Sequence, residues 1–162
     1  VVDPHGALVP DPAGLLDLPA GFSYDIVSRE GVPMADGFLT SGSFDGMAAF
    51  KVRGKPHQVA LVRNHELRPG QGAGTTLTSG YGQMPDGTYM PGGTTTLVLD
   101  AKTLKVERQH RSLAGTVRNC AGGVTPWGSW LTCEEPSSLL TRSTHHGYVF
   151  EVPATATGLV DP

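Results

Sequence analysis

Glycine and proline interrupt this chain so often that they leave little room for helices. The 162 residues include 22 glycines and 13 prolines. Proline removes a helical hydrogen bond and glycine lowers helix stability, so such a sequence favours turns. No stretch of ten residues places its apolar side chains at helical spacing. The glycines also lack a period of three, which excludes a collagen triple helix.

Short runs of β-branched, aromatic and aliphatic residues lie between the turns and predict strands. These runs cover residues 21–28, 47–52, 57–64, 94–100, 104–113, 128–133 and 147–152. The first run alternates apolar and polar side chains, and the fourth and fifth, joined by a short turn, predict a β-hairpin. Residues 1–20 predict an extended arm with at most one helical turn. The glycine-rich segment 67–93 predicts a long loop, and loops of this length are typically functional or disordered.

Short strands that alternate with turns predict an all-β fold in a single domain over residues 1–162. The pattern is typical of a sandwich, a barrel or a propeller, and the periodicity does not choose among them. One four-stranded propeller blade needs about 40 to 50 residues. A propeller-like fold would therefore be an incomplete ring of about three blades with long Gly/Pro-rich loops.

Composition argues against several classes of partner and site. Twelve Lys and Arg residues against fifteen Asp and Glu give a net charge of −3. This balance argues against a nucleic-acid-binding surface or a membrane-surface partner. No stretch approaches the ~18 apolar residues of a membrane span. Two cysteines are too few for a disulfide framework, and the sequence has no P-loop, GxSxG, HExxH, EF-hand or CxxC motif.

Four consecutive polar residues close the predicted strand at 57–64. They are Arg63, Asn64, His65 and Glu66. Asn and Glu offer oxygen ligands to calcium or magnesium, and His offers nitrogen to iron or zinc. The alternative is a polar strand end that enters a solvated loop.

A second cluster, Arg118-Asn119-Cys120, precedes Ala-Gly-Gly. The glycines allow the backbone to approach a ligand closely. Arginine suits a phosphate or a carboxylate, and a cysteine can be a thiolate metal ligand or a nucleophile. The alternative for Cys120 is a buried free thiol.

Two further clusters follow the strand at 128–133 and precede the strand at 147–152. Glu134 and Glu135 lie side by side, and a bend at Pro136 would let both carboxylates face one site, since neighbours on an extended chain point to opposite faces. Metal binding and solvent exposure both remain open for them. His145 and His146 are a weak metal signal, and a surface turn is the alternative.

These clusters, in this order, resemble the PhoX family of bacterial alkaline phosphatases. The stretches that carry the resemblance are LDLPAGFSY (16–24), DGMAAF (45–50), LVRNHEL (61–67), GGTTTLV (92–98), SLAGTVRNCAGGVTPWGSWLTCEEP (112–136) and HGYVFEVPA (146–154). The resemblance implies a β-propeller with added loops and a metal site near the propeller axis. It also implies iron and calcium as cofactors, phosphate monoesters as substrates, and export through the twin-arginine route to the periplasm or the medium.

Family members are much longer than this chain. We therefore expect the chain, which has no initiator methionine or signal peptide, to be the N-terminal portion of such a protein. The remaining portion of the same protein would then be its partner and would supply later blades and further acidic ligands.

The resemblance also implies roles for particular residues. Cys120 matches the position expected to bind iron. The amide of Asn64 and the carboxylates of Glu66, Glu134 and Glu135 match positions expected to bind calcium or iron. His65 is expected to be a metal ligand or a neighbour of one, and His146 is a weaker candidate. Arg118 and Asn119 lie beside the cysteine and are expected to contact phosphate.

The resulting hypothesis is a metal-dependent phosphomonoesterase. A cluster of cations neutralises the phosphate oxygens, a metal-bound oxygen attacks phosphorus, and Arg118 helps to hold the charge, so no protein nucleophile is needed. The alternative is a non-catalytic metal-binding propeller module, or a fragment that needs the rest of its chain. We expect Cys120 and Cys133 not to pair, because a disulfide would consume the expected iron ligand.

Overall fold

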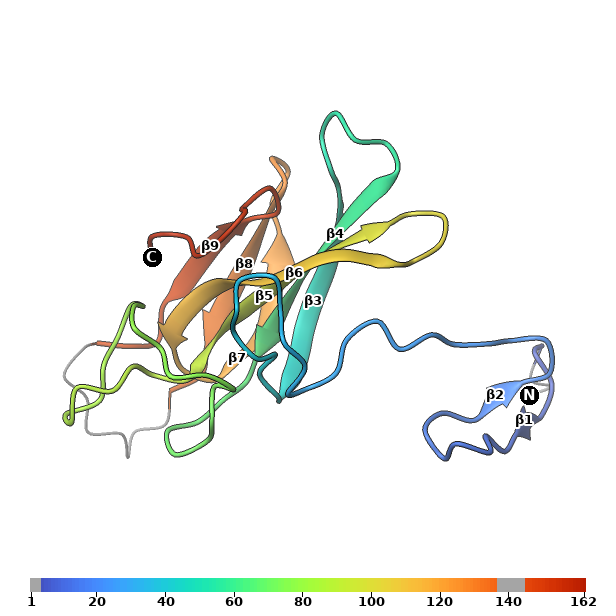
Figure 1. Cartoon of the computed structure of the whole chain (residues 1–162), viewed down its shortest axis with the longest axis horizontal. Coiled ribbons are helices and arrows are strands. Elements are labelled where there is room, and N and C mark those ends of the chain that lie inside the picture. The colour runs from blue at the N-terminus through green and yellow to red at the C-terminus, as the bar shows by residue number, and fades with distance from the viewer. Residues whose placement is uncertain (1–3, 137–144) are drawn as a thin grey trace.

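The computed structural model describes residues 4–136 and 145–162, which form strands and loops without any helix (Figure 1). The strands are β1 (Leu8–Val9), β2 (Leu18–Pro19), β3 (Phe44–Lys51), β4 (Gln58–His65), β5 (Gly92–Asp100), β6 (Val106–Thr116), β7 (Asn119–Val124), β8 (Ser129–Glu134) and β9 (Val149–Pro153). They form three antiparallel sheets, β1-β2, β3-β4-β5-β6 and β7-β8-β9. The predicted all-β class is confirmed.

The two larger sheets pack face to face around one apolar cluster. The four-stranded sheet contributes Phe50, Ala60, Val62 and Leu113, and the three-stranded sheet contributes Trp130, Phe150 and Val152. In the four-stranded sheet each strand pairs with the next along the chain, which is the arrangement of a propeller blade. A closed or partial propeller ring remains a prediction.

The predicted strand at 21–28 is wrong. Residues 22–29 have no regular structure, and the side chains of Phe22 and Ile26 are 56% and 46% exposed. Their alternation has no neighbouring strand to pair with, and an isolated strand is not stable in water. The segment instead links the N-terminal arm to β3 (Figure 1). The sequence predicted at most one helical turn in the N-terminal arm. The described part of the arm contains turns and the short β1-β2 pair instead.

Strand β7 lies where no strand was predicted. Its sequence, NCAGGV, has the small residues and glycines that are depleted in strands. It forms because β8 pairs with it, with a register shift between Asn119 and Gly122. A Cβ at Gly122 would overlap the indole ring of Trp130, so the glycine leaves the space in which that ring packs.

The predicted long loop at 67–93 is irregular up to residue 91, apart from an isolated bridge between Gln83 and Tyr89, and its last two residues, Gly92 and Gly93, begin β5. Part of it covers the outer edge of β6, where Tyr81 N donates to Ala114 O. A cleft of about 860 Å³ is lined by residues 69–77, 84, 86–89 and 91. None of the residues in the sequence-predicted polar clusters lines that cleft.

Asn64, at the end of β4, joins the two larger sheets. Its Nδ2 donates to Cys120 O at 2.8 Å and to Ala121 O at 3.0 Å, both on β7. Its Oδ1 accepts from Trp130 Nε1 at 2.8 Å and from Thr132 Oγ1 at 2.7 Å, both on β8. The side chain is fully buried, so these four bonds use its whole hydrogen-bonding capacity.

Replacing Asn64 tests this joint. Asn64→Ala leaves buried donors and acceptors on β7 and β8 unpaired, and we expect a loss of about 3 kcal/mol or more in the free energy of unfolding. Asn64→Asp keeps the shape but turns a carboxylate toward two carbonyl oxygens, so it should destabilise the fold comparably. Urea denaturation followed by tryptophan fluorescence measures both losses. Wild-type stability in either variant would contradict the role of Asn64 as the joint.

Candidate metal centre

Three potential metal ligands from distant parts of the chain converge at the junction of the two sheets. They are Asp45 on β3, Glu66 directly after β4, and Cys120 on β7. One ligand atom from each lies within 4.8 Å of the other two, and all three residues are partly buried. Two carboxylates and a thiol at this spacing have the donor chemistry of a cation site.

Local backbone features bring the three side chains together. The pairing of β3 with β4 shifts register between Phe44 and Met47, and such a bulge redirects the side chains within it, here Asp45. At the next residue, Gly46, an added Cβ would lie 2.6 Å from Cys120 O. The missing side chain therefore allows β7 to approach β3 closely enough for Cys120 to meet Asp45.

The electrostatics of the cluster favour a bound cation. A hydrogen bond to Asp45, burial, and the negative charges of Asp45, Glu135 and Glu66 raise the pKa of the Cys120 thiol to about 11. In the metal-free protein the thiol is therefore protonated at neutral pH. A cation at this position would compensate the converging negative charge and favour the thiolate, which is the form that binds metals.

Arg118 connects two of the acidic residues beside the centre. Its Nε and Nη2 donate to Glu66 Oε1 at 3.1 and 2.7 Å, and Nη1 donates to Glu135 O at 3.1 Å. Nη2 also lies 3.4 Å from Glu135 Oε2. The hydrogen bond with Glu66 raises the pKa of the guanidinium further. Arg118 has a φ of 49°, an unusual conformation for a non-glycine residue, and its backbone N donates to Leu67 O.

His65 and Asn119 are buried and bonded to other protein groups, as is Asn64. His65 Nδ1 donates to Gly42 O at 2.8 Å and Nε2 accepts from Thr95 Oγ1 at 2.9 Å. Burial lowers the pKa of His65 to about 3, so the ring is neutral. Asn119 Nδ2 donates to Thr132 Oγ1 at 2.9 Å. The structure does not bring these side chains into the cluster with Asp45.

Both carboxylate oxygens of Glu134 also bond to other groups of the protein. Its Oε1 accepts from Val117 N at 2.9 Å and pairs with His146 Nδ1 at 2.7 Å, and its Oε2 accepts from Gly147 N at 2.7 Å and Tyr148 N at 3.2 Å. The adjacent Glu135 points instead toward Arg118, so the two carboxylates do not share a site. The carboxylate of Glu134 fastens the start of β9 to the end of β8.

Of the residues that the sequence predicted for the site, the structure brings Glu66, Cys120, Arg118 and Glu135 close together, and it adds Asp45, which was not predicted. Asp45 is a single carboxylate just before a predicted strand, outside every polar cluster. Its one signal is the following glycine, since Asp-Gly at a strand start favours a turn or bulge. Cys120 and Cys133 are both free thiols, as expected.

The protein has an all-β scaffold that carries a cluster of two carboxylates and a thiol, so its general class is that of a candidate metalloprotein.

Comparison with protein families identifies the family. The model of the family described as alkaline phosphatase PhoX matches residues 4–110 and 88–162. The chain therefore belongs to the PhoX family of alkaline phosphatases. No curated protein and no solved structure matches the chain. The described residues contain no helix that is long and apolar enough to cross a membrane.

The environment of Cys120 predicts a change in its reactivity. Asp45→Asn removes the carboxylate that contributes most to the raised pKa, so the pKa of the thiol should fall toward its usual value of 9.0. In chelator-treated protein at pH 8, we expect alkylation of Cys120 by iodoacetamide to become about tenfold faster or more, since one pKa unit changes the thiolate fraction tenfold. Peptide mass spectrometry measures the rate, with Cys133 as an internal reference. An unchanged rate would show that Asp45 does not contact the thiol.

The close approach at Gly46 gives a second prediction. Gly46→Ala places a methyl group against Cys120 O and should lower the free energy of unfolding by about 1–3 kcal/mol. Gly123→Ala on β7 is the matched control, because its Cβ would meet nothing within 4 Å. Denaturant titration compares the two variants. Equal stabilities would rule out the steric role of Gly46.

Proposed function

We propose that this chain hydrolyses phosphate monoesters at a cation centre held by Asp45, Glu66 and Cys120. The observation that carries the proposal is the convergence of these three ligand atoms within 4.8 Å in a chain of an alkaline phosphatase family. Phosphate monoesters are dianions, and a site that gathers acidic ligands can bind them only through cations.

The donor set fits the cofactors that the family resemblance implies. Iron(III) accepts carboxylates together with a thiolate, so we assign iron to the position beside Cys120. Calcium takes oxygen ligands alone, so we assign it to the carboxylates of Glu66 and Glu135. When bound, these cations would neutralise the phosphate oxygens and lower the pKa of a coordinated water.

Arg118 has the clearest role among the chain's own residues. Its bonds to Glu66 and Glu135 fix the guanidinium and orient the Glu66 carboxylate at the same time. These bonds leave Nη1 with an N–H for a phosphate oxygen, which supports the predicted contact of Arg118 with substrate. Glu66 thus depends on Arg118 for its position, and Arg118 depends on Glu66 for its own.

The other predicted site residues support the centre from the protein side. Asn64 and Asn119 hold β7, which carries Cys120, and Glu134 holds the neighbouring ends of β8 and β9. Neutral His65 fixes the end of β4 just before Glu66. We propose positioning roles for these four residues. We also propose a periplasmic or secreted location, which rests on the family resemblance.

Metal content and turnover in the same samples test the proposal. The whole chain is loaded with iron(III) and calcium, its metals are counted by mass spectrometry, and hydrolysis of p-nitrophenyl phosphate is followed at alkaline pH. We expect Asp45→Asn, Glu66→Gln and Cys120→Ser each to lower turnover about 100-fold or more and to reduce bound metal. Asp25→Asn, an exposed carboxylate change, is the control and should leave both unchanged.

The pattern of results separates the alternatives. The phosphatase proposal is supported if the unmodified chain binds metal and turns over substrate, and if both metal content and turnover fall in the three variants. Stoichiometric metal without turnover contradicts it and identifies a metal-binding module. Turnover that survives Cys120→Ser with unchanged metal content would overturn the assignment of the centre.

A further inference from the structure

Positive charge gathers at one end of the four-stranded sheet, at the tips of its two outer hairpins. Six of the chain's twelve Lys and Arg residues lie there: Lys51, Arg53, Lys55, Lys102, Lys105 and Arg108. We call this group the basic end. Every lysine in it, and Arg53, is exposed. In a chain with a net charge of −3, such a concentration leaves the remainder of the molecule strongly acidic.

The two hairpins form one continuous surface. Ala101 N, in the β5–β6 turn, donates to His57 O, in the β3–β4 turn, at 2.7 Å. Arg53, Lys55 and Arg108 line a cleft of about 500 Å³ between the hairpins and the segment that follows β9. Cations that lie apart in the sequence therefore face one recess.

The cations of the basic end are not neutralised by the protein. Across residues 4–136 and 145–162, none of the six takes part in a salt bridge. The two carboxylates on these hairpins accept hydrogen bonds from neutral groups and form no salt bridge with the six cations. Asp100 accepts from Lys102 N and Thr103 N within its own turn, and Glu107, which also lines the cleft, accepts from Gln58. The positive charge thus remains available to a partner.

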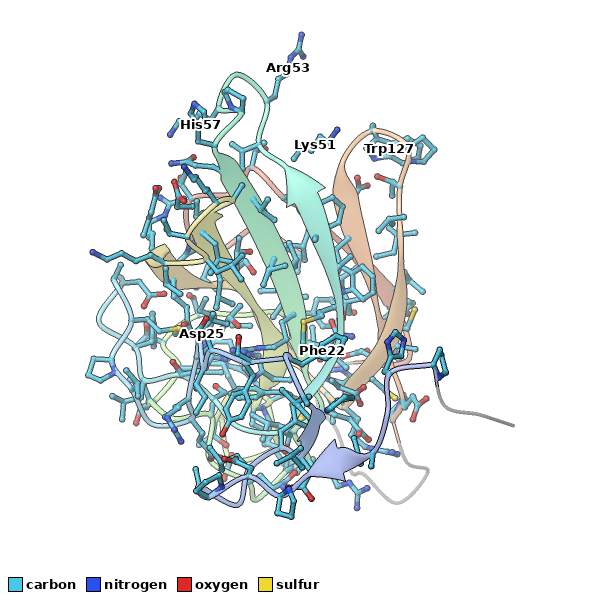
Figure 2. All side chains as sticks on the ribbon, turned by 90° about the vertical axis from the view of Figure 1, so that its right-hand side faces the viewer. Phe22, Asp25, Lys51, Arg53, His57 and Trp127 are labelled. Atoms are coloured by element: carbon cyan, nitrogen blue, oxygen red, sulfur yellow. The ribbon has the colours of Figure 1, made fainter. Side chains whose placement is uncertain are left out.

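An exposed tryptophan lies at the same end. Trp127, at the tip of the β7–β8 hairpin, is 72% exposed, and Figure 2 shows it at the end of the molecule that carries Lys51 and Arg53. Its Nε1 donates to Glu151 Oε1 at 2.6 Å, which fixes the ring at the surface. Val124, on the same hairpin, is 62% exposed. The second tryptophan of the chain, Trp130, is buried in the core.

We propose that the basic end, together with Trp127 and Val124, is a docking surface for an anionic lipid bilayer. Tryptophan sits favourably at the level of lipid headgroups, and lysine and arginine pair with lipid phosphates. The recess lined by Arg53, Lys55 and Arg108 has room for a headgroup. Val124, on the same hairpin as Trp127, adds an exposed aliphatic group, which a bilayer accommodates better than a nucleic acid does.

This orientation would direct the candidate metal centre away from the bilayer. Asp45 lies near the first residue of β3, and Lys51 is the last residue of the same strand. An eight-residue strand spans about 25 Å. The proposal does not depend on the chemistry of the centre, since it rests on the opposite end of the sheet.

Vesicle binding tests the proposal. The whole chain is sedimented with vesicles of equal parts phosphatidylglycerol and phosphatidylcholine, or of phosphatidylcholine alone. We expect binding to the anionic vesicles only, weakened at 0.5 M salt. Arg53→Gln with Lys55→Gln should reduce binding about tenfold. The matched control, Arg29→Gln with Arg68→Gln, removes the same charge from exposed positions outside the basic end and should leave binding unchanged.

Tryptophan emission provides a second readout. Insertion of Trp127 at the headgroup level should shift the emission to shorter wavelength on addition of anionic vesicles, and Trp127→Tyr should abolish that shift because Trp130 is already buried. Equal binding to both vesicle types, equal losses in the two double variants, or no binding at low salt would each overturn the proposal. Binding to a DNA duplex but not to vesicles would assign the surface to nucleic acid instead.

Discussion

The fold depends on one buried amide. Asn64 belongs to the four-stranded sheet, but all four hydrogen bonds of its side chain go to the three-stranded sheet. In the low dielectric of the core each of these bonds is strong, and each would be expensive to leave unmade. The amide therefore fixes where β7 lies relative to β3 and β4. Since β7 carries Cys120 and β4 ends just before Glu66, the same bonds set the dimensions of the candidate metal centre.

Sequence patterns predicted the strands whose side chains pack against a partner sheet. They did not predict segments that are strands, or are not strands, because of the neighbours available for pairing. The runs of Val, Leu and Thr at 57–64 and 94–100 form β4 and β5, because both faces of these strands are largely covered. The run at 21–28 has an equally good alternation but no neighbour, so it is not a strand. β7 has poor strand propensity and forms because β8 and Asn64 hold it. Strand pairing depends on the tertiary structure, so the local periodicity of a sequence does not predict it.

The candidate site was predicted in part for a related reason. A polar residue at a strand end can have either of two roles. It can form hydrogen bonds with buried groups of the protein, or it can bind a ligand. Glu66 and Cys120 face the centre, whereas Asn64, Asn119 and Glu134 satisfy buried protein groups, and residue type alone does not distinguish these uses. Asp45 reaches the centre through a backbone bulge that composition does not reveal. Net charge does not reveal how charge is distributed, because the average of −3 includes six cations at one end of the four-stranded sheet that make no salt bridge within residues 4–136 and 145–162.

The three ligands of the proposed centre come from the starts and ends of strands in both sheets, so a cation bound to all of them would act as a cross-link. A ligand that binds only the assembled state stabilises it in proportion to the logarithm of its free concentration. Metal supply would then govern how long the chain survives proteolysis, so that scarcity of the cation shortens the lifetime of the protein as well as limiting its chemistry.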